Sequence, residues 1–188
     1  MKISPRATLL IAATLLLTAC SHKEPEPAAA TPPAPPAGPT VLEIMTATMT
    51  PRSDAIWKLA GDLYDDKGNL DAKKLTDQQW TDMNLAAVAM SASAKTLGET
   101  GGIKVVAPGG RIQSEGTPDG ATAAQVQAAI DADPQGFAMF SAQLVAVADE
   151  IAAATAARDA MKTDDAQNRL NDVCMACHVK FWYPNQPK

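Results

Sequence analysis

The stretch Cys174-Met175-Ala176-Cys177-His178 lies close to the C-terminus of a chain of 188 residues. The pattern C-x-x-C-H is typical of covalent haem c attachment. Its spacing suits that chemistry, because two thiols add across the two vinyl groups of the porphyrin and the adjacent imidazole then binds the iron as proximal ligand. The whole chain has three cysteines and two histidines. The sequence therefore predicts one covalent haem c, held by Cys174, Cys177 and His178.

Three other interpretations of this motif stay open at this point. A zinc site needs four ligands, and after these three only His22 or a carboxylate remains. A thioredoxin-like C-x-x-C is usually found near a βαβ pattern, whereas this one ends a predicted helix. A structural disulfide between Cys174 and Cys177 would leave His178 without a role.

The N-terminal residues have the pattern of a secretory signal. Lys2 and Arg6 precede an apolar run over residues 9–17, which is too short to span a bilayer. The run closes with Leu-Thr-Ala-Cys at residues 17–20, which resembles the lipobox of bacterial lipoproteins. The alternative is an ordinary signal peptide in which Cys20 is coincidental.

The lipobox resemblance implies that residues 1–19 are removed and that Cys20 is lipidated. Several acyl chains give stable membrane anchoring, where a single chain would not. Ser21 stands where lipoproteins retained at the inner membrane typically have aspartate. The resemblance therefore favours a lipoprotein on the periplasmic face of the outer membrane.

Residues 20–40 are predicted to form a tether between the lipid anchor and a haem-binding domain over residues 41–188. Residues 21–40 hold seven of the fourteen prolines, many alanines and almost no large apolar side chain. Such a segment cannot bury enough surface to fold. In polyproline conformation, at 3.1 Å per residue, it would reach at most about 60 Å.

The chain is acidic, with a formal net charge of −5. Removal of the signal, with Lys2 and Arg6, would make it more negative. No basic patch indicates nucleic-acid binding. The charge favours partners with basic faces, such as redox proteins, through electrostatic steering. A solvated surface with no electrostatic role is the alternative.

Residues 41–188 are predicted to be all-α, because alanine is abundant, aromatic residues make up 4% of the chain and no period-2 run is sustained. Apolar periodicity and capping residues predict an antiparallel four-helix bundle. Residues 98–121, with seven of the eleven glycines, are predicted to form a loop. The helices are expected from about 41 to 63 with a kink or break at Thr50-Pro51, from 76 to 98, from 122 to 131 (short), from 134 to about 154, and from 163 to 184.

Antiparallel topology predicts where the haem lies. The first and third long helices begin at the end of the bundle where the second and fourth finish. Met45, near the start of the first, and His178, near the end of the fourth, are therefore expected at similar heights near one end of the bundle. Met45 is the predicted sixth iron ligand, and Met49 or an open position are the alternatives, because methionine on an apolar face often only fills space.

Other residues are expected around that end of the bundle. The three tryptophans, Trp57, Trp80 and Trp182, are interpreted as packing residues, with Trp182 near the haem edge. Loop 98–121 is expected close by. The remaining residues expected to line this end are Phe137, Phe140, Met90 and Leu97.

Residues 41–183 resemble the class II c-type cytochromes, the cytochrome c′ group, whose C-x-x-C-H motif also lies near the C-terminus of a four-helix bundle. In low-spin members a methionine near the start of the first helix is the sixth ligand, and Leu42-Glu43-Ile44-Met45 matches that position. The resemblance also makes homodimers an expectation. Phe181-Trp182 occupies positions where many members have a Tyr-Arg pair, and loop 98–121 has no counterpart.

The leading functional hypothesis is electron transfer by a tethered, periplasm-facing mono-haem cytochrome, because His–Met ligation raises the reduction potential and closes the iron. The alternative is binding or sensing of small gases, NO or CO, at a five-coordinate iron. Catalysis such as peroxide turnover ranks lowest, because no distal histidine or arginine is placed to assist it. The chain is therefore not expected to be an enzyme.

Overall fold

The computed structural model describes residues 38–99, 102–113, 115–117 and 120–183. Contacts between Cα atoms divide the chain into two units, Met1–Pro33 and Ala34–Lys188, and every described residue belongs to the second. The predicted signal peptide, Cys20 and nearly all of the predicted tether lie outside the described residues.

The described part of the chain is all-helical, as predicted, and contains no strand. A single isolated β-bridge joins Tyr64 to Leu70 in the connection that follows α2. The helical segments are α1 (Val41–Ile44), the π-helical η1 (Met45–Met49), α2 (Thr50–Gly61), the 3₁₀-helical η2 (Ala72–Lys74), α3 (Asp77–Glu99), α4 (Ala123–Ala132), α5 (Pro134–Ala156), α6 (Ala160–Cys177) and the π-helical η3 (His178–Trp182).

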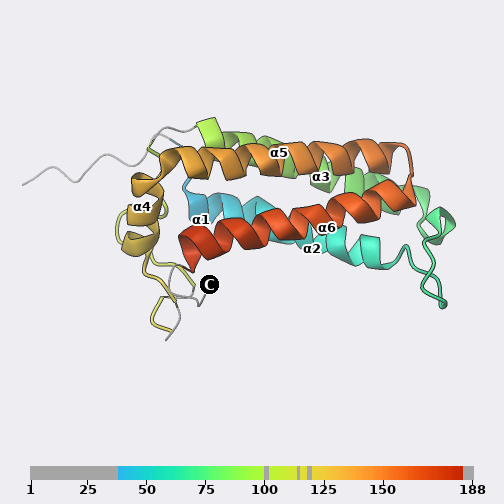
Figure 1. The fold of residues 1–188 in the computed structure, drawn as a ribbon, viewed down its shortest axis with the longest axis horizontal. Helices are drawn as coiled ribbons and strands as arrows, with labels where there is room; N and C mark the ends of the chain where they lie inside the picture. Colours follow the sequence, from blue (N-terminus) through green and yellow to red (C-terminus); the bar gives the residue numbers. More distant parts are fainter. Residues whose placement is uncertain (1–37, 100–101, 114, 118–119, 184–188) are drawn as a thin grey trace, which may run out of the picture. The chain divides into compact units, whose positions relative to one another are not determined.

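Four long helical stretches run lengthwise beside one another: α1–η1–α2, α3, α5 and α6 (Figure 1). The most extensive packing joins α3 to α5, followed by α5 to α6, whereas α6 packs much more loosely against α2. The short helix α4 packs against η3 and the start of α5. The large side chains that are fully buried between these elements include Ile56, Leu63, Met83, Met90, Ile151 and Leu170.

Helix α5 is long and apolar enough to cross a membrane by length and composition alone. It also packs along α3 and α6 and buries Phe137, Leu144 and Ile151 against them. A core helix has the same composition, so its apolar character is explained by packing.

Three predicted helix starts are confirmed by their caps. The hydroxyl oxygens of Thr76 and Thr122 accept hydrogen bonds from the N–H groups of Gln79 and Gln125, at 3.3 and 3.2 Å. Each glutamine side chain accepts in return from the threonine N–H, which completes a capping box. The carboxylate of Asp133 caps the first turn of α5.

The predicted start of the last helix is wrong by four residues. Helix α6 begins at Ala160, and its N-cap is Asp159, whose side chain accepts a hydrogen bond from the Lys162 N–H at 3.1 Å. Thr163, the expected cap, is fully buried inside the helix. The chain reverses within a very short turn through Arg158, at φ +53°, so the helix begins earlier than its apolar stripe indicates.

A kink or a break was expected at Thr50-Pro51, and the helix does not break there. Residues 41 to 61 are helical throughout, and the π-helical segment η1 immediately precedes α2. Proline has no N–H to bond the carbonyl four residues earlier and its ring crowds that carbonyl. The wider π turn accommodates this, and the Thr50 N–H bonds the carbonyl of Met45, five residues back.

The glycine-rich connection between α3 and α4 holds the start of α1. The N–H groups of Val41 and Leu42 donate to the carbonyls of Lys104 and Val105, at 2.8 and 3.0 Å. The first N–H groups of a helix have no partner within it, so the connection supplies acceptors that α1 itself cannot. Three apolar side chains of the connection, Ile103, Val105 and Ile112, are buried in the core.

The side chain of Gln127, on α4, fixes this connection in turn. Its Oε1 accepts from the Val105 N–H at 2.9 Å, and its Nε2 donates to the Ile103 carbonyl at 3.2 Å. A continuous set of hydrogen bonds therefore runs from α4 through the connection to α1.

Gly136, in the first turn of α5, leaves no room for a side chain. A Cβ at this position would lie 2.3 Å from Oδ2 of Asp133 and 2.8 Å from Nζ of Lys180. Oδ1 of Asp133 accepts the Gly136 N–H at 2.8 Å, and Oδ2 pairs with Lys180 of η3. The glycine therefore lets one carboxylate cap α5 and hold η3 at once.

We expect Gly136→Ala and Gly61→Ala to change the free energy of unfolding in opposite directions. Alanine favours a helix over glycine by about 0.8–1 kcal/mol, and a Cβ at Gly61 meets nothing within 4 Å, so Gly61→Ala should raise the free energy of unfolding. Gly136→Ala should lower it by about 1 kcal/mol, because displacing Asp133 loses the cap. Urea denaturation measures both, and equal stabilisation by the two variants would contradict the packing described for Asp133.

Candidate functional site

Two adjoining cavities lie where α6 and η3 face η1 and α2. The inner cavity has a volume of about 180 Å³ and the outer one about 280 Å³. They share Met45, Thr50 and His178 in their linings. Taken together they fall in the size range of ligand sites, about 300–1,000 Å³.

The inner cavity is lined by every long helical stretch. Met90 of α3 and Leu144 of α5 form its floor, and α2 and α6, which pack only loosely against each other, both line it. Its lining is mainly apolar or sulfur-bearing. The other residues that line it are Met45, Met49, Thr50, Ser53, Asp54, Trp57, Cys174, Cys177 and His178.

The predicted cofactor-binding residues therefore meet in one place. Met45, Cys174, Cys177 and His178 all line the inner cavity, from opposite ends of the described chain. Met49, the alternative ligand, also lines the inner cavity, but it is absent from the lining of the outer one. Met45 therefore shares both cavities with His178, whereas Met49 shares only the inner one.

Both π-helical segments begin at the site. The π turn η1 starts at Met45 and η3 starts at His178, with the Tyr183 N–H bonding the His178 carbonyl at 2.8 Å. Single π turns inside α-helices occur often at functional sites. The side chains at which they start, Met45 and His178, could each bind a metal, and both border the two cavities.

Segment η3 is fixed in place by Phe181, three residues after His178. The Phe181 ring is buried and makes edge-to-face contacts with Phe137 and Phe140 of α5, at centroid distances of 5.5 and 6.2 Å. Lys180 adds the ion pair with the α5 cap described above. Phe137 and Phe140 thus support the site through η3 and do not line its cavities.

Burial controls the protonation of the three motif residues. Burial raises the pKa of Cys174 to about 11 and that of Cys177 to about 12. The same cause lowers the pKa of His178. Near neutral pH the thiols are protonated and the imidazole is neutral, so a ring nitrogen lone pair is free to bind a metal.

The two motif cysteines are free thiols in the structure, so they do not form the disulfide considered above. Across the described ranges, no group of three or more His, Cys, Asp and Glu side chains is arranged to hold a metal ion.

Two of the predicted packing tryptophans lie at the site. Trp182 lines the outer cavity, with its ring centroid 6.3 Å from that of His178. Trp57 lines the inner cavity, and its buried indole N–H has no hydrogen-bond partner among the described residues. Trp80 is a packing residue as predicted, because it is buried and its N–H donates to the Ala72 carbonyl at 3.2 Å.

Several lining residues were not predicted. Gln113 and Tyr183 line the outer cavity, and Thr50 borders both. Gln113 comes from the glycine-rich connection, which therefore reaches the site, as expected of loop 98–121. Leu97, expected at this end of the bundle, lies beside Phe137 and Ile103 in a separate small hollow.

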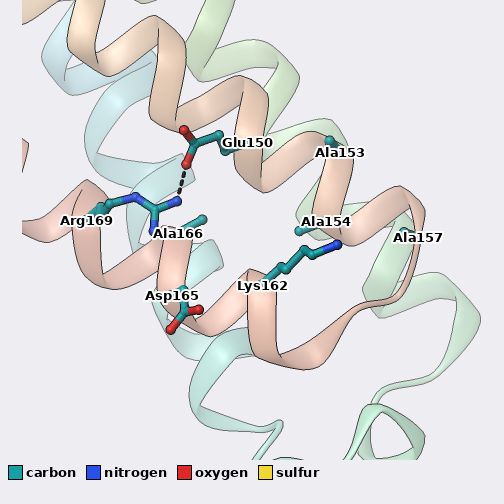
Figure 2. A pocket seen from close by; sticks show the side chains of 8 residues that line it. All are labelled: Glu150, Ala153, Ala154, Ala157, Lys162, Asp165, Ala166 and Arg169. Atoms are coloured by element: carbon teal, nitrogen blue, oxygen red, sulfur yellow. Dashed lines mark hydrogen bonds and ion pairs between the residues drawn. The ribbon is translucent and has the colours of Figure 1, made fainter.

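A larger hollow of about 410 Å³ lies between α5 and the first half of α6 (Figure 2). Alanines form its base, and its rim carries the charged side chains of Glu150, Lys162, Asp165 and Arg169. Arg169 pairs with Glu150, and Lys162 pairs with Asp159 just outside the hollow. The candidate iron ligands Met45, Met49 and His178 and the two motif cysteines do not line this hollow. The size of a hollow alone therefore does not identify the functional site.

Comparison of the chain with protein-family models, with curated proteins and with solved structures finds no match.

The pKa values of the two thiols predict slow alkylation of the folded, haem-free chain. With a pKa of about 11, roughly one in a thousand Cys174 side chains is thiolate at pH 8, and fewer still at Cys177. Because a raised pKa keeps the thiol protonated, the iodoacetamide rate should rise with pH to beyond pH 10, with Cys177 the slower residue. Peptide mass spectrometry separates the two sites.

The control is the same chain in denaturant, where both thiols should titrate near pH 8.5. A rate in the native chain that levels off near pH 8.5 would show that the cysteines are not buried as described.

Proposed function

We propose that the chain is a mono-haem c-type cytochrome that transfers electrons. Cys174 and Cys177 would hold the porphyrin through thioethers, His178 would bind the iron as proximal ligand, and Met45 would be the sixth ligand. The observation that carries this proposal is that Met45 and His178 border the same two cavities, with both cysteines in the inner one.

The residues present fit such a group. The donor set is two thiols, an imidazole and a thioether, and the C-x-x-C-H spacing is that of covalent haem attachment. Met90 and Leu144 give the inner cavity an apolar floor, as a porphyrin face requires.

Bound haem would supply reversible one-electron exchange at its iron. The chain's own residues define the environment of that exchange. His178, neutral because of its burial, would bind the iron, and Phe181 fixes its segment. Met45 would be the second iron ligand, and the mainly apolar lining would limit the access of water. A closed iron favours electron transfer over substrate chemistry, so we do not propose an enzymatic activity.

The same proposal includes the topology of the helices, the membrane anchor and the partners. The four long helical stretches would form an antiparallel four-helix bundle with haem near one end, as in the class II c-type cytochromes. Cys20 and the tether would hold this domain at the periplasmic face of the outer membrane as a lipoprotein. Basic redox proteins would be its partners, and pairing into homodimers follows from the same resemblance.

The sixth ligand is tested by visible spectra of the holo-protein, matured with a haem-ligation system, in both redox states. We expect low-spin spectra for the wild type and for Met49→Ala, and a high-spin, carbon monoxide-binding form for Met45→Ala. Met49 is the matched control. It lies about one helical turn after Met45, and it lines the inner cavity but not the outer one.

Two other outcomes would change the proposal. A wild type that is already high-spin and binds carbon monoxide readily would favour the gas-binding alternative, for which the outer cavity beside His178 offers space. A preparation that turns colourless on denaturation and extraction, with thiols still open to alkylation, would refute covalent haem altogether.

Replacement of either cysteine should lower the yield of folded holo-protein. Cys174→Ala and Cys177→Ala each remove one thioether, and without haem the inner cavity is left empty, at a cost that grows with its volume. Yield and thermal melting measure the effect. Met175→Ala is the control, because this side chain lies within the motif but is exposed. Melting that is the same for loaded and haem-free chains would contradict the coupling of haem to folding.

A further inference from the structure

The outer cavity is more polar than the inner one and is bordered by neither motif cysteine. Thr46, Thr50, Gln113 and Tyr183 contribute to its lining. None of the lysine, arginine, aspartate and glutamate side chains that the structure describes lines it, and its titratable side chains are His178 and Tyr183. Attachment of a porphyrin through thioethers does not by itself explain this polar space.

The iron ligands of the proposed function relate the two cavities to the two edges of a haem. Met45 and His178 border both cavities, so an iron bound by them would lie where the cavities meet. Cys174 and Cys177 border only the inner cavity, so the vinyl edge of the porphyrin would lie there. The two propionate carboxylates of haem are on the edge opposite the vinyl groups. A porphyrin held in this way extends past the iron into the outer cavity, with its propionates first.

The outer cavity offers hydrogen-bond donors that no other group uses. The Thr46 hydroxyl already donates to the Leu42 carbonyl at 2.8 Å. The side chains of Thr50, Gln113 and Tyr183 have no hydrogen-bond partner among the described residues. An amide or hydroxyl donor stabilises an ionised carboxylate.

Gln113 stands out among these donors, because its amide carries two N–H groups and its position is fixed by its neighbour. The preceding residue, Ile112, is buried in the core. The Ile112 N–H donates to the Glu115 carboxylate at 3.3 Å, and the Glu115 N–H donates to the Ile112 carbonyl at 3.1 Å. This turn places Gln113, at the end of the glycine-rich connection, in the wall of the outer cavity.

On the premise of the proposed function, we infer that the outer cavity takes the propionate edge of the haem and that the side-chain amide of Gln113 donates a hydrogen bond to a propionate. This makes Gln113 a positioning residue for the porphyrin. It also gives a role to the glycine-rich connection, which has no counterpart in the cytochromes that the chain resembles.

The placement is tested on the haem-loaded wild type by nuclear magnetic resonance. In the ferrous low-spin state the haem is diamagnetic, so nuclear Overhauser contacts can be assigned. We expect contacts from the propionate methylene protons to the Tyr183 ring and to the Gln113 side-chain amide. Contacts from these protons to Met90 or Trp57, which line only the inner cavity, would overturn the inference.

The role of Gln113 is tested by comparing Gln113→Glu with Gln143→Glu. Both substitutions replace an amide by a carboxylate of the same shape, and Gln143 is exposed on α5 and lines neither cavity. We expect Gln113→Glu to lower the midpoint potential more than Gln143→Glu does, because a negative charge close to the iron favours the ferric state, which carries one more positive charge.

The pH profile of the midpoint potential gives a second measurement on the same variants. The potential falls as a propionate ionises with rising pH. A carboxylate at position 113 disfavours that ionisation and raises the propionate pKa, so the fall should move to higher pH in Gln113→Glu. Equal changes in the two variants, or none in Gln113→Glu, would refute the role of Gln113.

The outcomes separate this inference from the proposed function. A wild-type chain without covalent haem would refute the proposed function itself. A haem-loaded chain whose propionates contact other parts of the protein would refute only the placement in the outer cavity.

Discussion

The packing of Phe181 between α5 and the end of α6 is the contact on which the site depends. Its ring meets Phe137 and Phe140 edge to face, and Lys180 beside it pairs with Asp133, the cap of α5. These contacts fix η3, and therefore His178, against the helix with the most extensive packing in the molecule. If His178 binds a metal as proposed, it has to be held to within fractions of an ångström, and a helix end without such contacts would fray.

The opposite wall of the site is positioned through a separate route. Gln127 of α4 holds the glycine-rich connection, whose carbonyls accept the first N–H groups of α1, and Met45 follows directly after α1. Thr40 completes this anchorage with a capping box on Glu43. The two routes converge on the corner between α4 and α5, because α4 packs against η3 as well. One end of the helical core thus sets the spacing between Met45 and His178.

The sequence predicts those features that local chemistry determines. Capping boxes such as Thr122–Gln125 act over three residues, and the motif at 174–178 carries its own spacing, so both could be read without a structure. The π turn η1 could not be predicted, because a proline such as Pro51 normally indicates a break in a helix. The role of the glycine-rich connection in holding α1 could not be predicted either, because the buried residues Ile103 and Val105 follow no helical period. No pattern in the sequence predicts that the indole N–H of Trp57 is buried without a hydrogen-bond partner among the described residues.

The loose contact between α2 and α6 explains why a cofactor would matter to the fold. Protein interiors are close-packed, and an unfilled apolar space costs stability in proportion to its volume. Small side chains let α3 and α5 approach closely, yet the space between α2 and α6 reaches the core at Met90 and Leu144. Larger side chains at those two positions would fill it, and the sequence does not use them. Under the proposed function, haem would fill this space, held by the two thiols and the imidazole that border it.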